Sequence, residues 1–219
     1  MDSNERFAVL FDFDGVVMDT ESQYSVFWHQ IGMDYLHYDN LEQIIKGQTL
    51  TTIFDIYFKH LEDRQGEIDR KLKCFEQHMK YEYIDGFEDF MADLREHGVK
   101  TAVVTSSDEG KMKAVYAAHP EIPELFDRIL TAEMFSKSKP DPDCYLLGMK
   151  IFGTDAHHTF VFEDSFNGLK SGLASGATVV GLATTNKAED IAPYCHYILH
   201  DYQDFSFDKL IGLNERKHS

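Results

Sequence analysis

The 219-residue sequence predicts an α/β protein whose parallel sheet is interrupted by an all-helical segment. Short apolar runs, rich in branched and aromatic residues, recur along most of the chain, and helical patterns separate them. This alternation is typical of parallel sheets, because each parallel strand needs a crossover connection. Residues 21–83 differ, since they contain few strand-like runs. We therefore expect a sheet-based core with a smaller helical domain inserted into it.

Four apolar runs are the expected strands of the core: residues 7–11, 101–104, 159–162 and 177–182. Each is short and almost continuously apolar, which is typical of strands covered by helices on both faces. Helices are expected between them. Residues 87–94 carry apolar side chains on one helix face, and Gly98 follows as a cap. The other predicted core helices cover residues 113–118, 144–152 and 165–175.

The inserted segment is predicted to contain several helices. Residues 20–23, Thr-Glu-Ser-Gln, fit a capping box that opens the first helix. Asn40 and Gly47 are expected to bound the second, and helical patterns continue over residues 50–61 and 68–83. A turn at residues 85–86 returns the chain to the core. The predicted division is residues 1–19 and 85–219 for the core, and residues 20–84 for the helical domain.

Composition and charge disfavour several functional classes. The chain carries 21 lysines and arginines against 38 acidic residues, a net charge of −17. This charge disfavours binding to nucleic acid or to anionic membranes, although a metal ion can still invert the field for a small anion. No apolar run is long enough to cross a membrane, and the polar first residues do not resemble a signal peptide.

The cysteines point to a reducing compartment. Cys74, Cys144 and Cys195 are odd in number, lie far apart and form no CxxC pair. A disulfide framework or a structural zinc site is therefore not expected, and the cytoplasm fits. The oligomeric state is left open, with a monomer favoured.

Two polar segments follow the first and second predicted strands, where open α/β sheets place their ligands. Asp12 and Asp14 are carboxylates just past a buried strand, and such groups need a metal ion or hydrogen bonds unless they lie in a solvated turn. Thr105 and Ser106 can form an anion cradle with successive backbone N–H groups, or simply cap the next helix.

Two further segments complete the pattern. Lys139 stands in Lys-Pro-Asp-Pro-Asp, where prolines stiffen the loop that presents its charge to a phosphate or a carboxylate. Taken alone, it would be an ordinary surface lysine. Glu163 and Asp164 end the third predicted strand, and adjacent carboxylates suit a hard divalent cation. The alternative is an acidic start to the following helix.

The order and spacing of these segments decide between the alternatives. Asp-x-Asp-Gly-x-x-x-Asp-Thr, a hydroxyl at a strand end, Lys-Pro-x-Pro-Asp and Glu-Asp-Ser resemble the four motifs of the haloacid-dehalogenase-like superfamily, over about Val9 to Leu182. The helical segment resembles the small cap of the subgroup that includes phosphoglycolate phosphatases and β-phosphoglucomutases. The resemblance implies a Rossmann-like parallel sheet with this cap above its carboxyl edge.

The resemblance also implies roles for the motif residues. Asp12 matches the nucleophile that forms an aspartyl-phosphate, and Asp14 matches the general acid–base. Thr105, the N–H of Ser106 and Lys139 would bind the phosphate, with Lys139 also balancing the charge on Asp12. The expected cofactor is Mg²⁺, whose ligands would be Asp12, the backbone carbonyl of Asp14, Asp164 and, directly or through water, Glu163.

These roles favour a phosphatase for a small phosphomonoester, such as a sugar phosphate. Dehalogenases and phosphonate-cleaving relatives lack an acid–base aspartate at the position of Asp14. A sugar phosphomutase is the alternative. β-Phosphoglucomutases grip a second phosphate with a cap-loop arginine and a Lys-Asn pair, and Leu50, Asp108 and Glu109 stand at those positions here. Their cap-hinge histidine is replaced by Tyr24.

Substrate specificity is expected to depend on the cap loop, where Lys46, Gln48 and Thr49 are the candidate residues. Lys46 could compensate for the missing arginine, which keeps the mutase alternative open. The cap aromatics, including Tyr24 and Trp28, are expected to form a helical core rather than a stacking box. A non-catalytic protein that retains the fold is a third hypothesis, weakened because every charged motif position is present.

Overall fold

The computed structural model describes residues 6–217, with side chains up to residue 213, and it contains one six-stranded parallel sheet. The strand order is β3-β2-β1-β4-β5-β6. This architecture confirms the predicted α/β class with a Rossmann-like core. The strands are β1 (Ala8–Phe11), β2 (Lys100–Val104), β3 (Arg128–Leu130), β4 (Thr159–Glu163), β5 (Thr178–Leu182) and β6 (Tyr197–Leu199).

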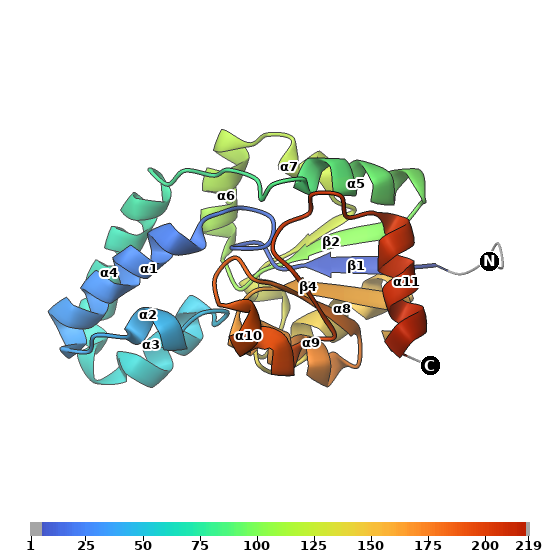
Figure 1. The fold of residues 1–219 in the computed structure, drawn as a ribbon. Helices are drawn as coiled ribbons and strands as arrows, with labels where there is room; N and C mark the ends of the chain where they lie inside the picture. The colour runs from blue at the N-terminus through green and yellow to red at the C-terminus, as the bar shows by residue number, and fades with distance from the viewer. Residues whose placement is uncertain (1–5, 218–219) are drawn as a thin grey trace.

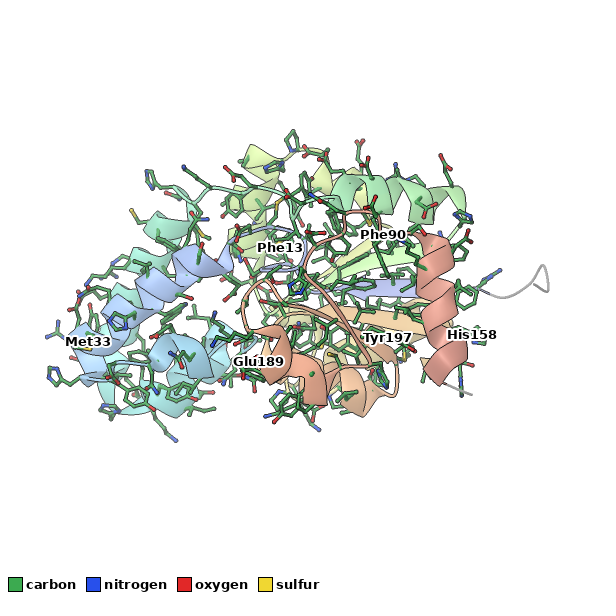
Figure 2. All side chains as sticks on the ribbon, viewed as in Figure 1. Phe13, Met33, Phe90, His158, Glu189 and Tyr197 are labelled. Atoms are coloured by element: carbon green, nitrogen blue, oxygen red, sulfur yellow. The ribbon has the colours of Figure 1, made fainter. Side chains whose placement is uncertain are left out.

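Helices cover both faces of the sheet (Figure 1). The core helices are α5 (Phe87–Glu96), α6 (Glu109–Ala118), α7 (Ile122–Leu125), α8 (Asp143–Phe152), α9 (Phe166–Ser175), α10 (Ala188–Ile191) and α11 (Phe207–Lys217). Alternate strand residues point to opposite faces: Phe11 packs in a cluster with α5, α6 and α11, whereas Leu10 packs in a cluster with α8, α9 and α10. Figure 2 shows Phe90 of α5 above the strands.

A helical insert, residues 20–84, lies beyond the carboxyl end of β1, with Met33 at its far end (Figures 1 and 2). Its helices are α1 (Glu21–Ile31), α2 (Leu41–Ile44), α3 (Leu50–Tyr57) and α4 (Glu62–Glu76). Eight buried side chains form a separate apolar cluster in the insert. They are Trp28, Ile31, Leu41, Ile45, Ile53, Phe58, Ile68 and Leu72. The predicted division into two domains stays a prediction.

The sheet register brings the predicted site residues together. Phe11, the last residue of β1, pairs with Val103 of β2 and with Phe162 of β4. The residues that follow these three, Asp12, Val104 and Glu163, therefore lie at the same carboxyl edge of the sheet. This places Asp12 between the ends of β2 and β4, directly beneath the insert.

Several predicted boundaries were wrong. Residues 77–83 are not helical, because this segment returns beside residues 17–19, which lead from β1 into the insert: Asp19 N–H donates to the carbonyl of Glu82, and Ile84 N–H donates to that of Val17. The predicted helix over residues 50–61 ends at Tyr57, and a separate 3₁₀ turn follows. The sequence analysis also missed β3 and β6, which have three residues each and are incompletely buried.

The predicted capping box at residues 20–23 does not form. Thr20 stands at the N-cap of α1, but its side chain caps no backbone N–H. Its hydroxyl instead donates a hydrogen bond to Oδ1 of Asp14. The Thr20 hydroxyl, which the local pattern assigns to the start of the helix, therefore binds the carboxylate of Asp14 instead.

The aromatic cluster on the sheet provides a test of the fold. Phe162 is fully buried on β4, with ring centroids 5.0 Å from Phe11 and 5.8 Å from Tyr202. We expect Phe162→Ala to lower the free energy of unfolding by about 3–5 kcal/mol, because it leaves a cavity between the sheet and α5. Urea unfolding measures this loss. The control Val26→Ala, at a 73% exposed position, should change it by less than about 0.5 kcal/mol.

A loss below about 1 kcal/mol for Phe162→Ala would contradict this packing, since it would place Phe162 outside a close-packed core.

Candidate active site

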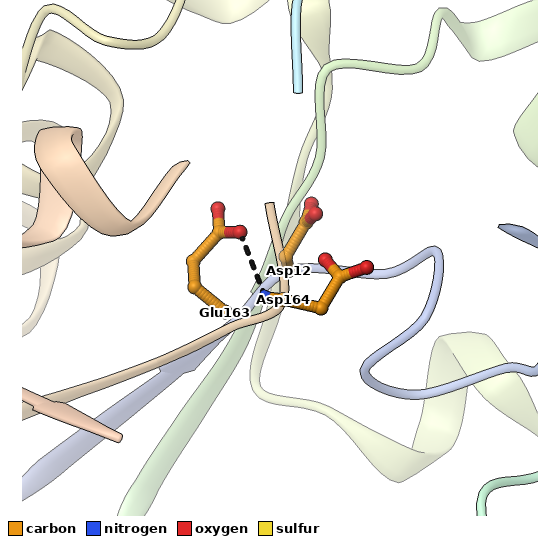
Figure 3. A group of neighbouring side chains, drawn as sticks. All are labelled: Asp12, Glu163 and Asp164. Carbon is orange, nitrogen blue, oxygen red and sulfur yellow. Dashed lines mark hydrogen bonds between the residues drawn. The ribbon is translucent and has the colours of Figure 1, made fainter. Parts of the chain in front are cut away.

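Three buried carboxylates meet at the carboxyl edge of the sheet (Figure 3). Asp12 follows β1, Glu163 ends β4, and Asp164 comes next in the chain. Their exposed fractions are 6%, 0% and 1%, and one oxygen atom from each lies within 4.8 Å of the others. The sequence analysis named all three, and the sheet register explains why they are neighbours.

Lys139 compensates part of this negative charge. Its buried ammonium lies 3.0 Å from Oδ1 of Asp12 and 2.6 Å from Oε1 of Glu163, and it donates to the carbonyl of Val104. Burial alone would lower the pKa of Lys139, but the charges of Asp12 and Glu163 outweigh burial and raise it. The lysine therefore stays protonated beside Asp12.

Glu163 is held by many donors. Its oxygens accept hydrogen bonds from Lys139, from the hydroxyl of Tyr145 at 2.5 Å, and from the N–H of Asp164 and the N–H and hydroxyl of Ser165. Gly168 leaves the space it needs, because a Cβ there would lie within 2.0 Å of the carboxylate. Tyr145 was missed by the sequence analysis, since no motif includes it.

Asp164 has an oxygen open to a ligand. Among the described residues no donor meets hydrogen-bond geometry at its buried Oδ2, although the nearby hydroxyl of Thr185 acts to lower the pKa of this carboxyl. Burial, reinforced by the charge of Glu21, raises the pKa of Asp164 well above its usual value. Burial and the charge of Glu163 likewise raise the pKa of Asp12 to about 7, against the effect of Lys139. An all-oxygen site with excess negative charge and a free oxygen fits a hard divalent cation.

Asp14 lies beside this cluster, and donors from three segments hold its carboxylate. The hydroxyl of Thr20 donates to Oδ1, the hydroxyl of Ser107 donates to Oδ2 at 3.3 Å, and the ammonium of Lys111 pairs with Oδ2. Lys111 was missed by the sequence analysis. Its signal is weak, because it is a buried lysine in a helix with no motif around it.

The predicted phosphate-binding segment follows β2. Thr105 is 1% exposed, and its hydroxyl accepts the N–H of Ser107. The hydroxyl of Ser106 donates to the carbonyl of Gly47 in the insert at 2.8 Å. The N–H of Thr49 donates to the hydroxyl of Ser138. These contacts dock the loop of residues 46–49 against the core, directly over the sheet edge.

A pocket of about 560 Å³ lies between the core and this loop. Asp12 and Asp14 line it from the core, as do Thr105 and Ser106. The predicted specificity residues all line it from the insert. Lys46 pairs there with Glu21 at 3.2 Å. The other two are Gln48 and Thr49.

Four positions were compared with the second-phosphate and hinge residues of β-phosphoglucomutases, and three of them line the pocket. Leu50 and Asp108 line the pocket, and the carboxylate of Asp108 also accepts the N–H of Lys111. Glu109 is exposed and does not line the pocket. Tyr24 lines it and donates its hydroxyl to Glu76. Trp28 belongs to the buried cluster of the insert, as predicted, and also lines the pocket.

Comparisons with known proteins agree with this site. The sequence pattern of the haloacid dehalogenase-like hydrolases matches residues 9–182, which span all four motifs. The chain is 27% identical over 183 residues to the fructose-1-phosphate phosphatase YqaB of Escherichia coli, covering 80% of this chain and 96% of that protein.

A second relative is the bifunctional riboflavin kinase/FMN phosphatase of Arabidopsis thaliana, 25% identical over 209 residues and 92% of this chain. The alignment spans 55% of the length of that plant enzyme. The crystal structure of a β-phosphoglucomutase from Clostridium difficile matches with a TM-score of 0.78 at 16% identity, covering 97% of this chain and 99% of that one. This likeness shows the fold alone.

Within the described residues, no helix combines the length and the apolar character needed to span a membrane. The family pattern covers most of the chain, including the strand ends that carry Asp12, Thr105 and Glu163. The chain therefore belongs to the haloacid dehalogenase-like hydrolase family.

Proposed function

We propose that this protein is a Mg²⁺-dependent phosphatase that hydrolyses a small phosphomonoester, such as a sugar phosphate, through an aspartyl-phosphate on Asp12. The observation that carries the proposal is the Asp12 carboxylate, which lies between Lys139 and Asp164 and opens into a pocket that Asp14 also lines. Relatives named as a fructose-1-phosphate phosphatase and an FMN phosphatase support this reaction class.

Asp12 and Asp164, with the backbone carbonyl of Asp14, would hold the Mg²⁺ ion. When bound, the ion supplies positive charge that neutralises the phosphoryl group and the carboxylates around it. The oxygens of Glu163 already accept several hydrogen bonds. We therefore propose that Glu163 mainly holds Lys139 beside Asp12, and that its contact with the ion is through water.

The reaction then divides between two carboxylates. An oxygen of Asp12 forms a bond to phosphorus while the bond to the ester oxygen breaks, and Asp14 gives its proton to the departing alcohol. In the second half, the Asp14 carboxylate takes a proton from water. That water forms a bond to phosphorus, and the bond between phosphorus and Asp12 breaks. Thr105 and the N–H of Ser106 would bind the phosphate oxygens.

The charges of the pocket favour a hydrolase over a mutase. A mutase must hold a second phosphate, and a bound phosphate needs positively charged donors. Lys46 and Lys111 are the lysines that line the pocket, and each already pairs with a carboxylate. Leu50 and Asp108 offer no positive charge at the positions aligned with the arginine and the lysine that bind the second phosphate in β-phosphoglucomutases. A water molecule is therefore the favoured acceptor of the phosphoryl group.

The wider predictions follow from this function. The partner would be a small phosphorylated metabolite, and nucleic acid and membranes are not expected as partners. The helical insert would be the cap domain, residues 20–84, above a core of residues 1–19 and 85–219. The cytoplasmic location and the monomeric state stay predictions.

The nucleophile is tested by Asp12→Asn. The amide cannot attack phosphorus, so we expect kcat for p-nitrophenyl phosphate to fall more than about 100-fold, or about 2.7 kcal/mol in barrier, with an unchanged circular dichroism spectrum. Asp89→Asn, at an exposed position of α5, is the matched control and should keep wild-type turnover. Retention of more than a hundredth of kcat in Asp12→Asn would rule out the nucleophile assignment.

The metal is tested by removal and return. Turnover should vanish in EDTA and recover with Mg²⁺, because charge neutralisation at the three carboxylates is needed for phosphoryl transfer. Excess Ca²⁺ should inhibit, since it takes more ligands at longer distances and would misplace the oxygens of Asp12. Undiminished turnover of the metal-free enzyme would refute the proposed cofactor.

Hydrolase and mutase are separated by their products. With β-glucose 1-phosphate, even primed with the 1,6-bisphosphate, inorganic phosphate should appear faster than glucose 6-phosphate, because the pocket lysines are already paired. Time courses of both products measure the ratio. If glucose 6-phosphate accumulates well ahead of phosphate, the enzyme is a mutase and Lys46 or another insert residue holds the second phosphate.

A further inference from the structure

The pocket carries a large excess of negative charge. Among the described residues, its lining includes eight carboxylates but only two lysines and no arginine or histidine. Lys46 is paired with Glu21, and Lys111 is paired with Asp14. Apart from Asp12 beside Lys139, five lining carboxylates have no lysine or arginine partner within the part of the chain that the structure describes, and one of them, Glu42, lies beside His29: Glu42, Asp55, Glu76, Asp108 and Glu133. The part of the pocket that receives the organic group of the substrate is therefore acidic.

Glu76 is the most deeply buried of these unpaired carboxylates. It ends α4, and its exposed fraction is 7%. Oε1 accepts the hydroxyl of Tyr24 at 2.8 Å, whereas Oε2 receives no hydrogen bond from any described residue. Burial raises the pKa of Glu76 to about 7, although the charge of Lys111 opposes this rise. A positive group in the pocket would relieve the cost of this buried charge.

Two aromatic side chains line the same pocket as this carboxylate. Tyr24 and Trp28 are one turn apart on α1, and both line the pocket. The ring of Tyr24 already has the ammonium of Lys111 at 4.5 Å from its centroid. Trp28 is 7% exposed, since it packs in the apolar cluster of the insert, and no lysine or arginine lies over its ring among the described residues. Tryptophan faces attract ammonium groups most strongly among the aromatic side chains.

We propose that the pocket selects phosphomonoesters whose organic part carries an ammonium group, such as an amino-sugar phosphate, and that Glu76 sets this preference. The inference rests on the proposed phosphatase function and names its substrate class. The phosphate would lie at Asp12 and the ammonium at Glu76 and Trp28, which line the insert side of the same pocket. A second anionic group in the substrate would meet Glu76 and Asp108 instead and be repelled.

The experiment compares three six-carbon phosphomonoesters: glucosamine 6-phosphate, glucose 6-phosphate and 6-phosphogluconate, which are cationic, neutral and anionic in their organic parts. We expect kcat/KM to be about tenfold higher for glucosamine 6-phosphate than for glucose 6-phosphate, and lowest for 6-phosphogluconate. Tenfold corresponds to one charge contact of modest strength in a half-buried pocket. High salt should reduce the ratio, because it screens charges.

Glu76→Gln tests the residue itself. Glutamine keeps an oxygen for the hydroxyl of Tyr24 but removes the charge, so the glucosamine-to-glucose ratio should fall from about ten to about one. The control Glu88→Gln removes an exposed carboxylate on α5, and all three substrates should behave as with the wild type. A ratio in Glu76→Gln equal to that of the wild type would overturn the role of Glu76.

The wild-type enzyme alone already decides the substrate class. If it hydrolyses glucose 6-phosphate or 6-phosphogluconate as fast as glucosamine 6-phosphate, the ammonium preference is wrong while the phosphatase function stands. If it releases phosphate from none of these esters and none from p-nitrophenyl phosphate, the phosphatase function itself is wrong. The two failures are therefore distinguishable.

Discussion

The ammonium of Lys139 lies between Asp12 and Glu163, and the candidate site depends on this contact. Three carboxylates are buried within a few ångströms of one another, and like charges in such a place repel strongly. One lysine with an exposed side-chain fraction of 0% compensates only part of that charge. The remaining excess favours a divalent cation, and together they would leave Asp12 ionised and able to attack phosphorus.

The sheet and the insert supply this arrangement from distant parts of the chain. The pairing of β1 with β2 and β4 brings Asp12, Thr105 and Glu163 to one edge. The loop of residues 46–49 then closes the pocket through hydrogen bonds to Ser106 and Ser138. In the proposed reaction, the core would therefore provide the groups that act on a phosphate, and the insert would provide the charges and rings that meet the rest of the substrate.

Local patterns in the sequence predict the parts of the site that lie at the ends of strands. The four longer strands and the motif residues at their ends are recognisable because buried parallel strands are continuously apolar and stop at polar residues. The short strands β3 and β6 lack that signal, since each has three incompletely buried residues. The match of the family pattern over residues 9–182 confirms the recognition made from the motifs.

Residues that act through distant contacts were not predictable in this way. The hydroxyl of Tyr145 donates to Glu163, which is 18 residues away in the sequence. Lys111 pairs with Asp14, which is 97 residues away in the sequence. Glu76 looks like an ordinary residue of a highly charged helix until the structure places it beside Tyr24 and the pocket. Thr20 shows the converse, because its local pattern predicts a helix cap while its hydroxyl binds Asp14. In each case, tertiary structure decides the role.

The central claim is that Asp12 carries the phosphoryl group during turnover. The most direct test quenches the wild-type enzyme with acid in the first turnover, reduces any acyl phosphate with borohydride and locates the reduced residue by mass spectrometry. Modification confined to the peptide containing Asp12, and absent without substrate, is the predicted result. Phosphate release by an enzyme whose Asp12 is never modified, or modification at another carboxylate, would contradict the account.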